Sequence, residues 1–151
     1  MADLTAGEIP KYSNVPNGGV ALIAASSNTV AIGVDTNGAS CYTAGSSGGR
    51  VYALLASTND TVTVNVFVWI LRGSTVIPLG LVNVPLSSGN VTAVANVTFL
   101  NGTVLAGLPY DNQGNKYIPL NANDVLRVGA LANLTSGKTC WVSAIGSDYQ
   151  A

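Results

Sequence analysis

Residues 61–70 carry the clearest secondary-structure signal of the chain and read Thr61-Val62-Thr63-Val64-Asn65-Val66-Phe67-Val68-Trp69-Ile70. Its even positions are all aliphatic, whereas its odd positions begin polar and end aromatic. Because successive side chains of a strand point to opposite faces, this period of two predicts a β-strand whose even positions, Val62 to Ile70, lie in the core. Phe67 and Trp69 are then expected on the opposite face, where a free monomer would carry polar side chains. We therefore predict that Phe67 and Trp69 contact a partner.

Short β-prone runs fill the chain from residue 20 onward, separated by turn-forming Gly, Ser, Asn and Asp. Further strands are expected at 20–25, 29–34, 41–43, 50–56, 76–84, 91–100, 116–120, 125–131 and 139–146. Pro78 predicts an edge strand or a bulge in its run, since proline has no N–H to donate to a neighbouring strand. About eight strands without a helical period favour an all-β fold, an antiparallel β-sandwich of jelly-roll type.

Residues 1–19 differ from the rest of the chain, because they contain Pro10, Pro16 and a Gly pair but no sustained period. We expect an extended N-terminal arm over 1–19 and a β-sandwich domain over 20–151. The arm is either a frayed terminus or a tether that orders on a neighbouring subunit. As a tether, it would contact its partner through Ile9, Tyr12 and Val15.

Charged side chains are scarce: six Lys or Arg and seven Asp or Glu make up 9% of the 151 residues, against about 25% in a soluble domain. The surface is expected to be partly uncharged and polar, and partly hidden in an assembly. The net charge of −1 and the scattered basic residues argue against a nucleic-acid partner. No apolar run approaches the ~20 residues that span a bilayer, and the N-terminus lacks the features of a secretory signal. We therefore expect no membrane partner, and synthesis in a cytosol.

The sequence contains no histidine, which removes the commonest general base at neutral pH and the commonest zinc ligand. Its carboxylates lie near predicted turns and termini, where Asp mimics backbone turns. We expect no enzyme activity, no cofactor and no metal. Residues 111–115, Asp-Asn-Gln-Gly-Asn, are expected to form a turn, with a calcium-binding loop as the alternative. Cys41 and Cys140 are expected to be buried thiols, with a disulfide between them as the alternative.

A set of short motifs between residue 108 and the end of the chain resembles a known group of proteins. The motifs are Leu108-Pro109-Tyr110-Asp111, Gly114-Asn115-Lys116-Tyr117-Ile118-Pro119-Leu120, Leu126-Arg127-Val128-Gly129, Ser136-Gly137-Lys138-Thr139 and Gly146-Ser147-Asp148-Tyr149. This layout is similar to the small β-sandwich or jelly-roll virion proteins of tailed bacteriophages, which include capsid decoration (cement) proteins. The resemblance implies a homotrimer that is made in the host cytoplasm and seated on the capsid surface. Its partner would be the major capsid protein, and it would stabilise the shell.

Two other functions stay open at the level of sequence. A carbohydrate- or host-surface-binding module, such as the knob of a head fibre, would use Trp69, Trp141, Tyr110 or Tyr117 to stack on sugars. A hydrolase on a jelly-roll frame would need two carboxylates about 5–10 Å apart in a cleft, and no spacing in the sequence favours such a pair.

Overall fold

The structure is a computed structural model, and it describes residues 13–24, 28–91, 93–101 and 104–150. This part of the chain contains nine strands and no helix. The strands are β1 (Ser13–Ala24), β2 (Ala39–Thr43), β3 (Gly49–Thr58), β4 (Val64–Arg72), β5 (Thr75–Val84), β6 (Val97–Thr98), β7 (Ile118–Leu120), β8 (Val125–Ala130) and β9 (Thr139–Tyr149).

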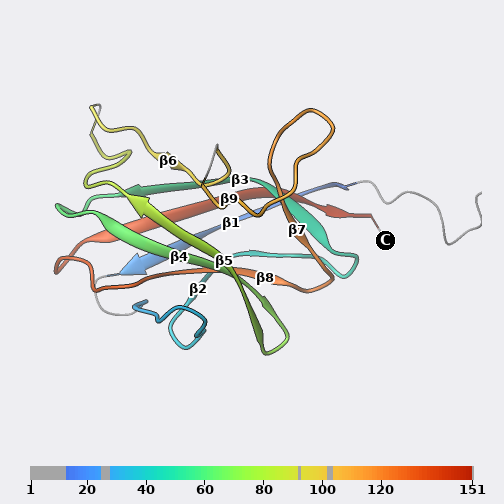
Figure 1. The fold of residues 1–151 in the computed structure, drawn as a ribbon, viewed down its shortest axis with the longest axis horizontal. Helices are drawn as coiled ribbons and strands as arrows, with labels where there is room; N and C mark the ends of the chain where they lie inside the picture. The colour runs from blue at the N-terminus through green and yellow to red at the C-terminus, as the bar shows by residue number, and fades with distance from the viewer. Residues whose placement is uncertain (1–12, 25–27, 92, 102–103, 151) are drawn as a thin grey trace, which may run out of the picture.

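The strands form two antiparallel sheets that pack against each other as a sandwich (Figure 1). The five-stranded sheet has the order β1-β9-β3-β6, with β7 also paired to β3, and the four-stranded sheet has the order β2-β8-β4-β5. When β6 and β7 are taken together as one position beside β3, this is the strand order of a jelly roll. The predicted antiparallel sandwich of jelly-roll type is therefore confirmed, with nine strands where about eight were expected.

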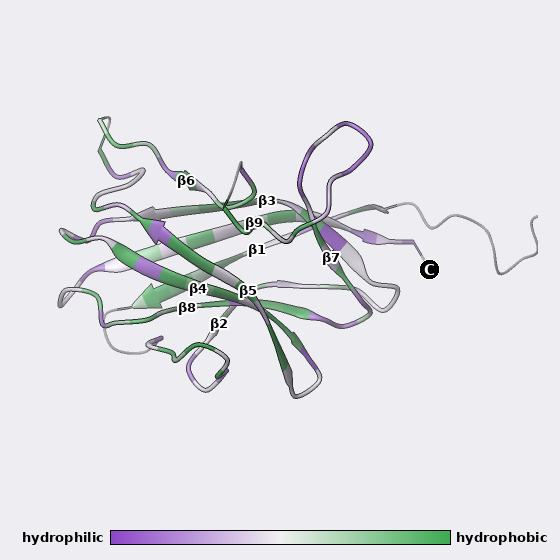
Figure 2. Cartoon of the chain, viewed as in Figure 1, coloured by the Kyte–Doolittle hydropathy of each residue, from purple (hydrophilic) through white to green (hydrophobic). Residues whose placement is uncertain are grey.

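The core lies between the two sheets and is built by the alternation seen in the sequence. Val64, Val66, Val68 and Ile70 of β4 point inward and are at most 5% exposed, as predicted. Val62 is an exception, because the strand begins only at Val64 and the Val62 side chain is 52% exposed. Figure 2 shows green hydrophobic stretches along the strands of both sheets, whereas the protruding part of the loop between β6 and β7 is hydrophilic.

Pro78 lies in β5, which is an edge strand of the four-stranded sheet. The register between β4 and β5 shifts at this point, since Val68 pairs with Gly80 and Trp69 pairs with Pro78. Leu79 is thus the extra residue of a bulge. The prediction of an edge strand or a bulge is confirmed, and both features occur at once.

Three segments have a different structure from the one predicted, beyond shifts of a few residues at strand ends. Residues 13–19, expected in the arm, form the first half of β1 and pair with β9. This is compatible with Pro16 because β1 is an edge strand. Residues 29–34 are not a strand but a loop. Of residues 91 and 93–100, which the structure describes, only Val97 and Thr98 form a strand, β6. Ile9 and Tyr12 lie outside the described residues.

Two buried carboxylates hold the ends of the sandwich. Asp60 accepts hydrogen bonds from the Thr61 N–H at 2.6 Å and from the Thr135 N–H and Oγ1 at 2.9 and 2.6 Å. Burial of Asp60 opposes its ionisation, but these hydrogen bonds outweigh it and lower the pKa of the carboxyl. Asp124 forms a two-pronged ion pair with Arg72 at 2.9 and 2.7 Å, which lowers the pKa of Asp124. Both carboxylates therefore act as structural acceptors.

The two cysteines are free thiols on the inner side of the sandwich, as predicted. Burial raises the pKa of both Cys41 and Cys140 to about 12. Each thiol therefore stays protonated at neutral pH, whereas thiolate chemistry requires the deprotonated form.

Candidate functional site

Phe67 and Trp69, the two predicted contact residues of β4, are buried within the chain. Their side chains are 1% and 0% exposed, and their rings stack with centroids 4.9 Å apart. They form a second apolar cluster with Val30, on the outer side of the four-stranded sheet. The prediction that these rings contact a partner is therefore wrong for this conformation, because another segment of the same chain already covers them.

The covering segment is the loop between β1 and β2. Val30 enters the cluster and its N–H donates to the carbonyl oxygen of Ala130 at 2.8 Å. Gly129, which pairs with Phe67, leaves room for Val30, since a Cβ at that position would lie 2.7 Å from its methyl groups. Glycine within a strand is a signal of such a close approach. This signal in the sequence could have shown that the Phe67 face is covered.

Asp35 fixes the same loop over Trp69. Its Oδ1 accepts a hydrogen bond from the Trp69 Nε1–H at 2.7 Å and lies 3.0 Å from the Arg127 Nε. Arg127 is the cross-strand neighbour of Trp69, and its guanidinium also donates to the Gly38 carbonyl. A Cβ on Gly38 would lie 2.2 Å from the indole ring, so this position also requires glycine. The loop is thus held by polar contacts around an apolar centre.

The outer face of the five-stranded sheet is different, because its side chains remain in solvent. The register of β1, β9 and β3 places its outward residues in three rows across the sheet, here called the open face. The rows are Leu22–Trp141–Ser57, Val20–Ser143–Leu55 and Gly18–Ile145–Ala53.

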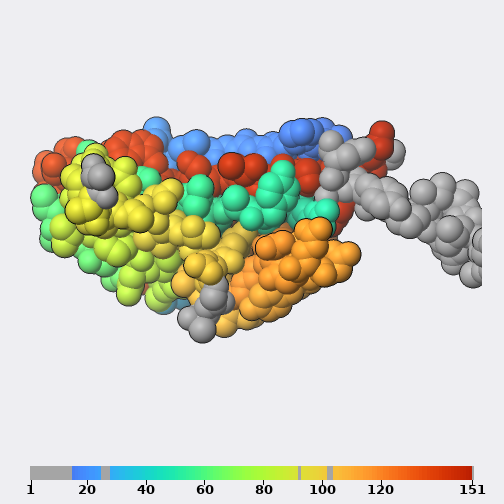
Figure 3. Space-filling model, turned by 90° about the horizontal axis from the view of Figure 1, so that it is seen from above, coloured from blue at the N-terminus to red at the C-terminus, as the bar shows by residue number. Residues whose placement is uncertain are grey.

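The open face is apolar and uncharged. Val20, Leu22 and Ile145 are 57%, 56% and 49% exposed, and no residue of the three rows carries a charge. Figure 3 looks onto this side of the molecule, where β1, β9 and β3 run as neighbouring blue, red and teal bands. A contiguous apolar surface of this kind marks an interaction site more often than single exposed apolar residues do. The sequence signal was present but missed: Val20, Leu22, Trp141 and Ile145 are apolar and stand at alternating positions of the predicted strands 20–25 and 139–146.

Val15, the third predicted contact residue of the arm, lies at the start of β1 and is 47% exposed. Val15 is thus accessible, and it lies in the same strand, β1, that contributes Gly18, Val20 and Leu22 to the open face. The structure does not bring Val15 together with Phe67 or Trp69, which lie on the outer side of the other sheet.

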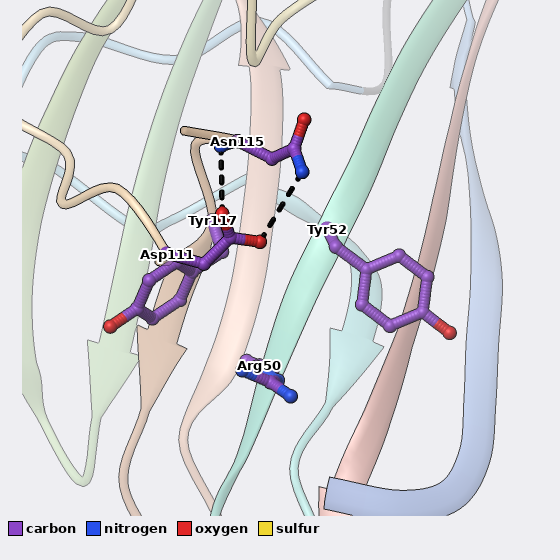
Figure 4. Close-up of a pocket in the computed structure, with 5 residues that line it drawn as sticks. All are labelled: Arg50, Tyr52, Asp111, Asn115 and Tyr117. Carbon is purple, nitrogen blue, oxygen red and sulfur yellow. Dashed lines mark hydrogen bonds between the residues drawn. The ribbon is translucent and has the colours of Figure 1, made fainter. Parts of the chain in front are cut away.

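A hollow of about 320 Å³ lies at one end of the five-stranded sheet, beside the loop between β6 and β7. Its lining residues are Arg50, Tyr52, Asp111, Asn115 and Tyr117. In Figure 4, Asp111 and Tyr117 lie on one side and Tyr52 on the other, with Arg50 between them in the view. Of the aromatic residues considered from the sequence for sugar stacking, Tyr117 lines this hollow; Tyr52 was missed.

Asp111 organises the loop that borders the hollow. Its Oδ1 accepts hydrogen bonds from the N–H groups of Asn115 and Gln113 at 2.8 and 2.9 Å, and these bonds lower the pKa of Asp111. The sequence 111–115 is thus a turn closed by its own carboxylate, as predicted. Within the described ranges, no group of three or more Cys, Asp or Glu side chains is placed to hold a metal ion.

No protein-family model matches the chain, and no curated protein matches it. Across the residues that the structure covers, there is also no helix that is long and apolar enough to cross a membrane.

Proposed function

We propose that the chain is a structural virion protein of a tailed phage that associates with copies of itself and decorates and stabilises the capsid. The observation that carries the self-association is the open face of the five-stranded sheet. The capsid setting rests on the resemblance of residues 108–151 to phage virion proteins, which also suggests a trimer. In this proposal the chain acts through surface contacts and without catalysis.

The chemistry of the open face favours a second copy of the same chain as its occupant. At an interface between copies of one chain, a charge on the open face would be desolvated and would need a partner charge elsewhere on the same chain. The three rows carry no charge, and their hydroxyl groups, from Ser57 and Ser143, are neutral. Such a face can pack against its own copy without desolvating an unpaired ion.

The apolar side chains of the open face supply the favourable free energy. Burying a Val, Leu or Ile side chain completely is worth about 1.5–3 kcal/mol. Val20, Leu22 and Ile145 are each about half exposed, so each would contribute a part of that amount on association. This gain would also explain why a chain with 9% charged residues leaves these side chains uncovered.

The segment that precedes β1 is the proposed contact with the major capsid protein. Ile9 and Tyr12 belong to this segment, and Val15 follows them at the start of β1. The segment can be removed without cutting a described strand, because β1 starts at Ser13. A variant that lacks residues 1–12 is expected to fold and self-associate normally but to bind capsids more weakly. Unchanged capsid binding in co-sedimentation would contradict a role for this segment.

The location of the protein provides the direct test of the proposed function. Virions of the phage that encodes the chain would be labelled with an antibody raised against it and viewed by electron microscopy. We expect label over the capsid shell, at many sites per particle. Label confined to the tail, or virions without label, would contradict the proposal.

A further inference from the structure

The hollow lined by Arg50, Tyr52, Asp111, Asn115 and Tyr117 lies beside the open face rather than within its three rows. An irregularity in β3 forms one wall of the hollow. The register between β3 and β9 shifts between Val51 and Ala53, which makes Tyr52 the extra residue of a bulge. Bulges redirect side chains and are common beside binding sites. Here the bulge leaves the Tyr52 ring 49% exposed at the edge of the hollow.

The two tyrosine rings of the hollow are held in place. The Tyr52 hydroxyl donates a hydrogen bond to the Gly146 carbonyl oxygen at 3.2 Å, across the neighbouring strand β9. The guanidinium of Arg50 lies over the ring of Tyr117, 6.0 Å from its centroid. A ring that is fixed before binding loses little conformational entropy when a ligand packs on it. Tyr52 therefore offers a pre-oriented, half-exposed aromatic surface.

The polar groups of the hollow are planar and equally pre-oriented. Asp111 is fixed by the Asn115 and Gln113 amides, and its Oδ2 accepts a 3.4 Å hydrogen bond from the Asn115 side chain. Figure 4 shows the two hydrogen bonds between Asn115 and Asp111, with the Asn115 side-chain amide extending towards the side of Tyr52. Carboxylate, amide and guanidinium groups each present two donor or acceptor positions in one plane. Such pairs match the neighbouring hydroxyls of a sugar ring.

The charges of the hollow cancel, so they give no net preference for an acidic or a basic ligand. Arg50 contributes one positive charge and Asp111 one negative charge, and the charge of Arg50 helps to lower the pKa of Asp111. An acidic ligand would approach an ionised Asp111, and a basic one would approach Arg50. The volume of about 320 Å³ lies at the lower end of the range of about 300–1,000 Å³ for small-molecule pockets. These features fit a short segment of a carbohydrate.

We propose that this hollow binds a neutral saccharide, with the C–H face of a sugar ring on Tyr52 and its hydroxyls on Arg50, Asp111 and Asn115. The site does not depend on the self-association proposed above, because none of its residues belongs to the open-face rows. It would give the protein a second function, attachment to a glycan-bearing surface.

The test is a glycan array of neutral and acidic oligosaccharides, probed with the full-length protein. The strongest neutral glycan would then be titrated into isotope-labelled protein and followed by NMR. We expect binding to neutral glycans, with chemical-shift changes concentrated at the amides of Asn115, Tyr117 and Tyr52. An array without neutral hits, or shift changes away from these residues, would overturn the proposal.

Variants separate the stacking and hydrogen-bonding parts of the site. Tyr52→Ala is expected to weaken binding by about threefold to tenfold. Tyr52→Phe keeps the ring but loses the hydrogen bond to Gly146 that orients it, so a smaller loss of affinity is expected. Arg50→Gln is expected to weaken binding about tenfold, because it removes a charged donor. Leu81→Ala is the matched control on the other sheet and should bind as the wild type does. Equal affinity of Tyr52→Ala and Leu81→Ala would contradict the assignment.

Discussion

The two outer faces of this sandwich carry similar apolar side chains but differ in what covers them. On the four-stranded sheet, the loop between β1 and β2 packs Val30 and Asp35 over Phe67 and Trp69. On the five-stranded sheet, Val20, Leu22 and Ile145 remain about half exposed. An apolar outer face is therefore not by itself a sign of a partner, because the chain can supply its own cover.

The difference between the two faces can be read in their polar surroundings. The covered face is bordered by groups that hold the loop, namely the ion pair between Asp35 and Arg127 and the Trp69 Nε1–H that donates to Asp35. The open face has no such groups in its rows, and its outward hydroxyls are those of Ser57 and Ser143. We infer that the first face serves the stability of the chain and the second serves association.

Alanine substitution of one tryptophan on each face tests whether the two faces have different roles. Trp69→Ala removes a fully buried ring and is expected to lower the free energy of unfolding by about 3–5 kcal/mol. Trp141→Ala, on the half-buried open face, should lower it by about 1 kcal/mol and weaken self-association instead. Chemical denaturation together with light scattering measures both effects. Similar losses of stability in the two variants would remove the distinction between the faces.

Asp35 tests whether the cover of Trp69 depends on its polar contacts. Asp35→Ala leaves the indole N–H without its acceptor and the Arg127 guanidinium without its ion-pair partner, which is expected to cost about 1–3 kcal/mol of stability. Asp35→Asn keeps an acceptor for the indole and should cost less. Trp fluorescence of Asp35→Ala should shift to the red as the ring gains water. An unshifted spectrum with full stability would show that apolar packing alone holds the loop.

The pH dependence should also differ between folding and association. Asp60 and Asp124 have a lowered pKa in the folded protein, so the stability that they provide is present above the ordinary Asp value of about 3.9. It is lost as the pH falls through their folded-state pKa values. The rows of the open face contain no titratable group, so the oligomer mass should be constant between about pH 5 and pH 8. Loss of the oligomer within that range, with the fold intact, would argue against association through the open face.

The sequence predicted the architecture well because the alternation of β4 and the placement of Pro78 are local signals. The inward positions from Val64 to Ile70, the edge position of β5 and its bulge all follow from spacing and from proline chemistry. Whether the outward side chains of β4 are buried or exposed depends on a segment that is distant in sequence. Val30 and Asp35 cover Phe67 and Trp69 through tertiary contacts. In the sequence, these contacts are indicated by glycine at 38 and 129, where a Cβ would clash with Trp69 and Val30.

The candidate sites were harder to predict for the same reason. The open face is assembled from β1, β9 and β3, which are distant in sequence, and its rows emerge only from the register between them. The hollow depends on the bulge that exposes Tyr52. The residue types at 51–53 do not predict a bulge at this position. The turn at Asp111, in contrast, was predictable because its hydrogen bonds join residues within the same short segment.

The most direct test of self-association through the open face is the mass in solution of two matched leucine variants. Leu22 on the open face is 56% exposed, and Leu81 on the outer side of the other sheet is 47% exposed, so Lys at either position should leave the fold intact. By light scattering at the same concentration, we predict the mass of a trimer for the wild-type protein and for Leu81→Lys. We predict a monomer for Leu22→Lys, because each contact through the open face would bury an unpaired charge. A monomeric wild-type protein, or an undiminished oligomer of Leu22→Lys, would contradict the account.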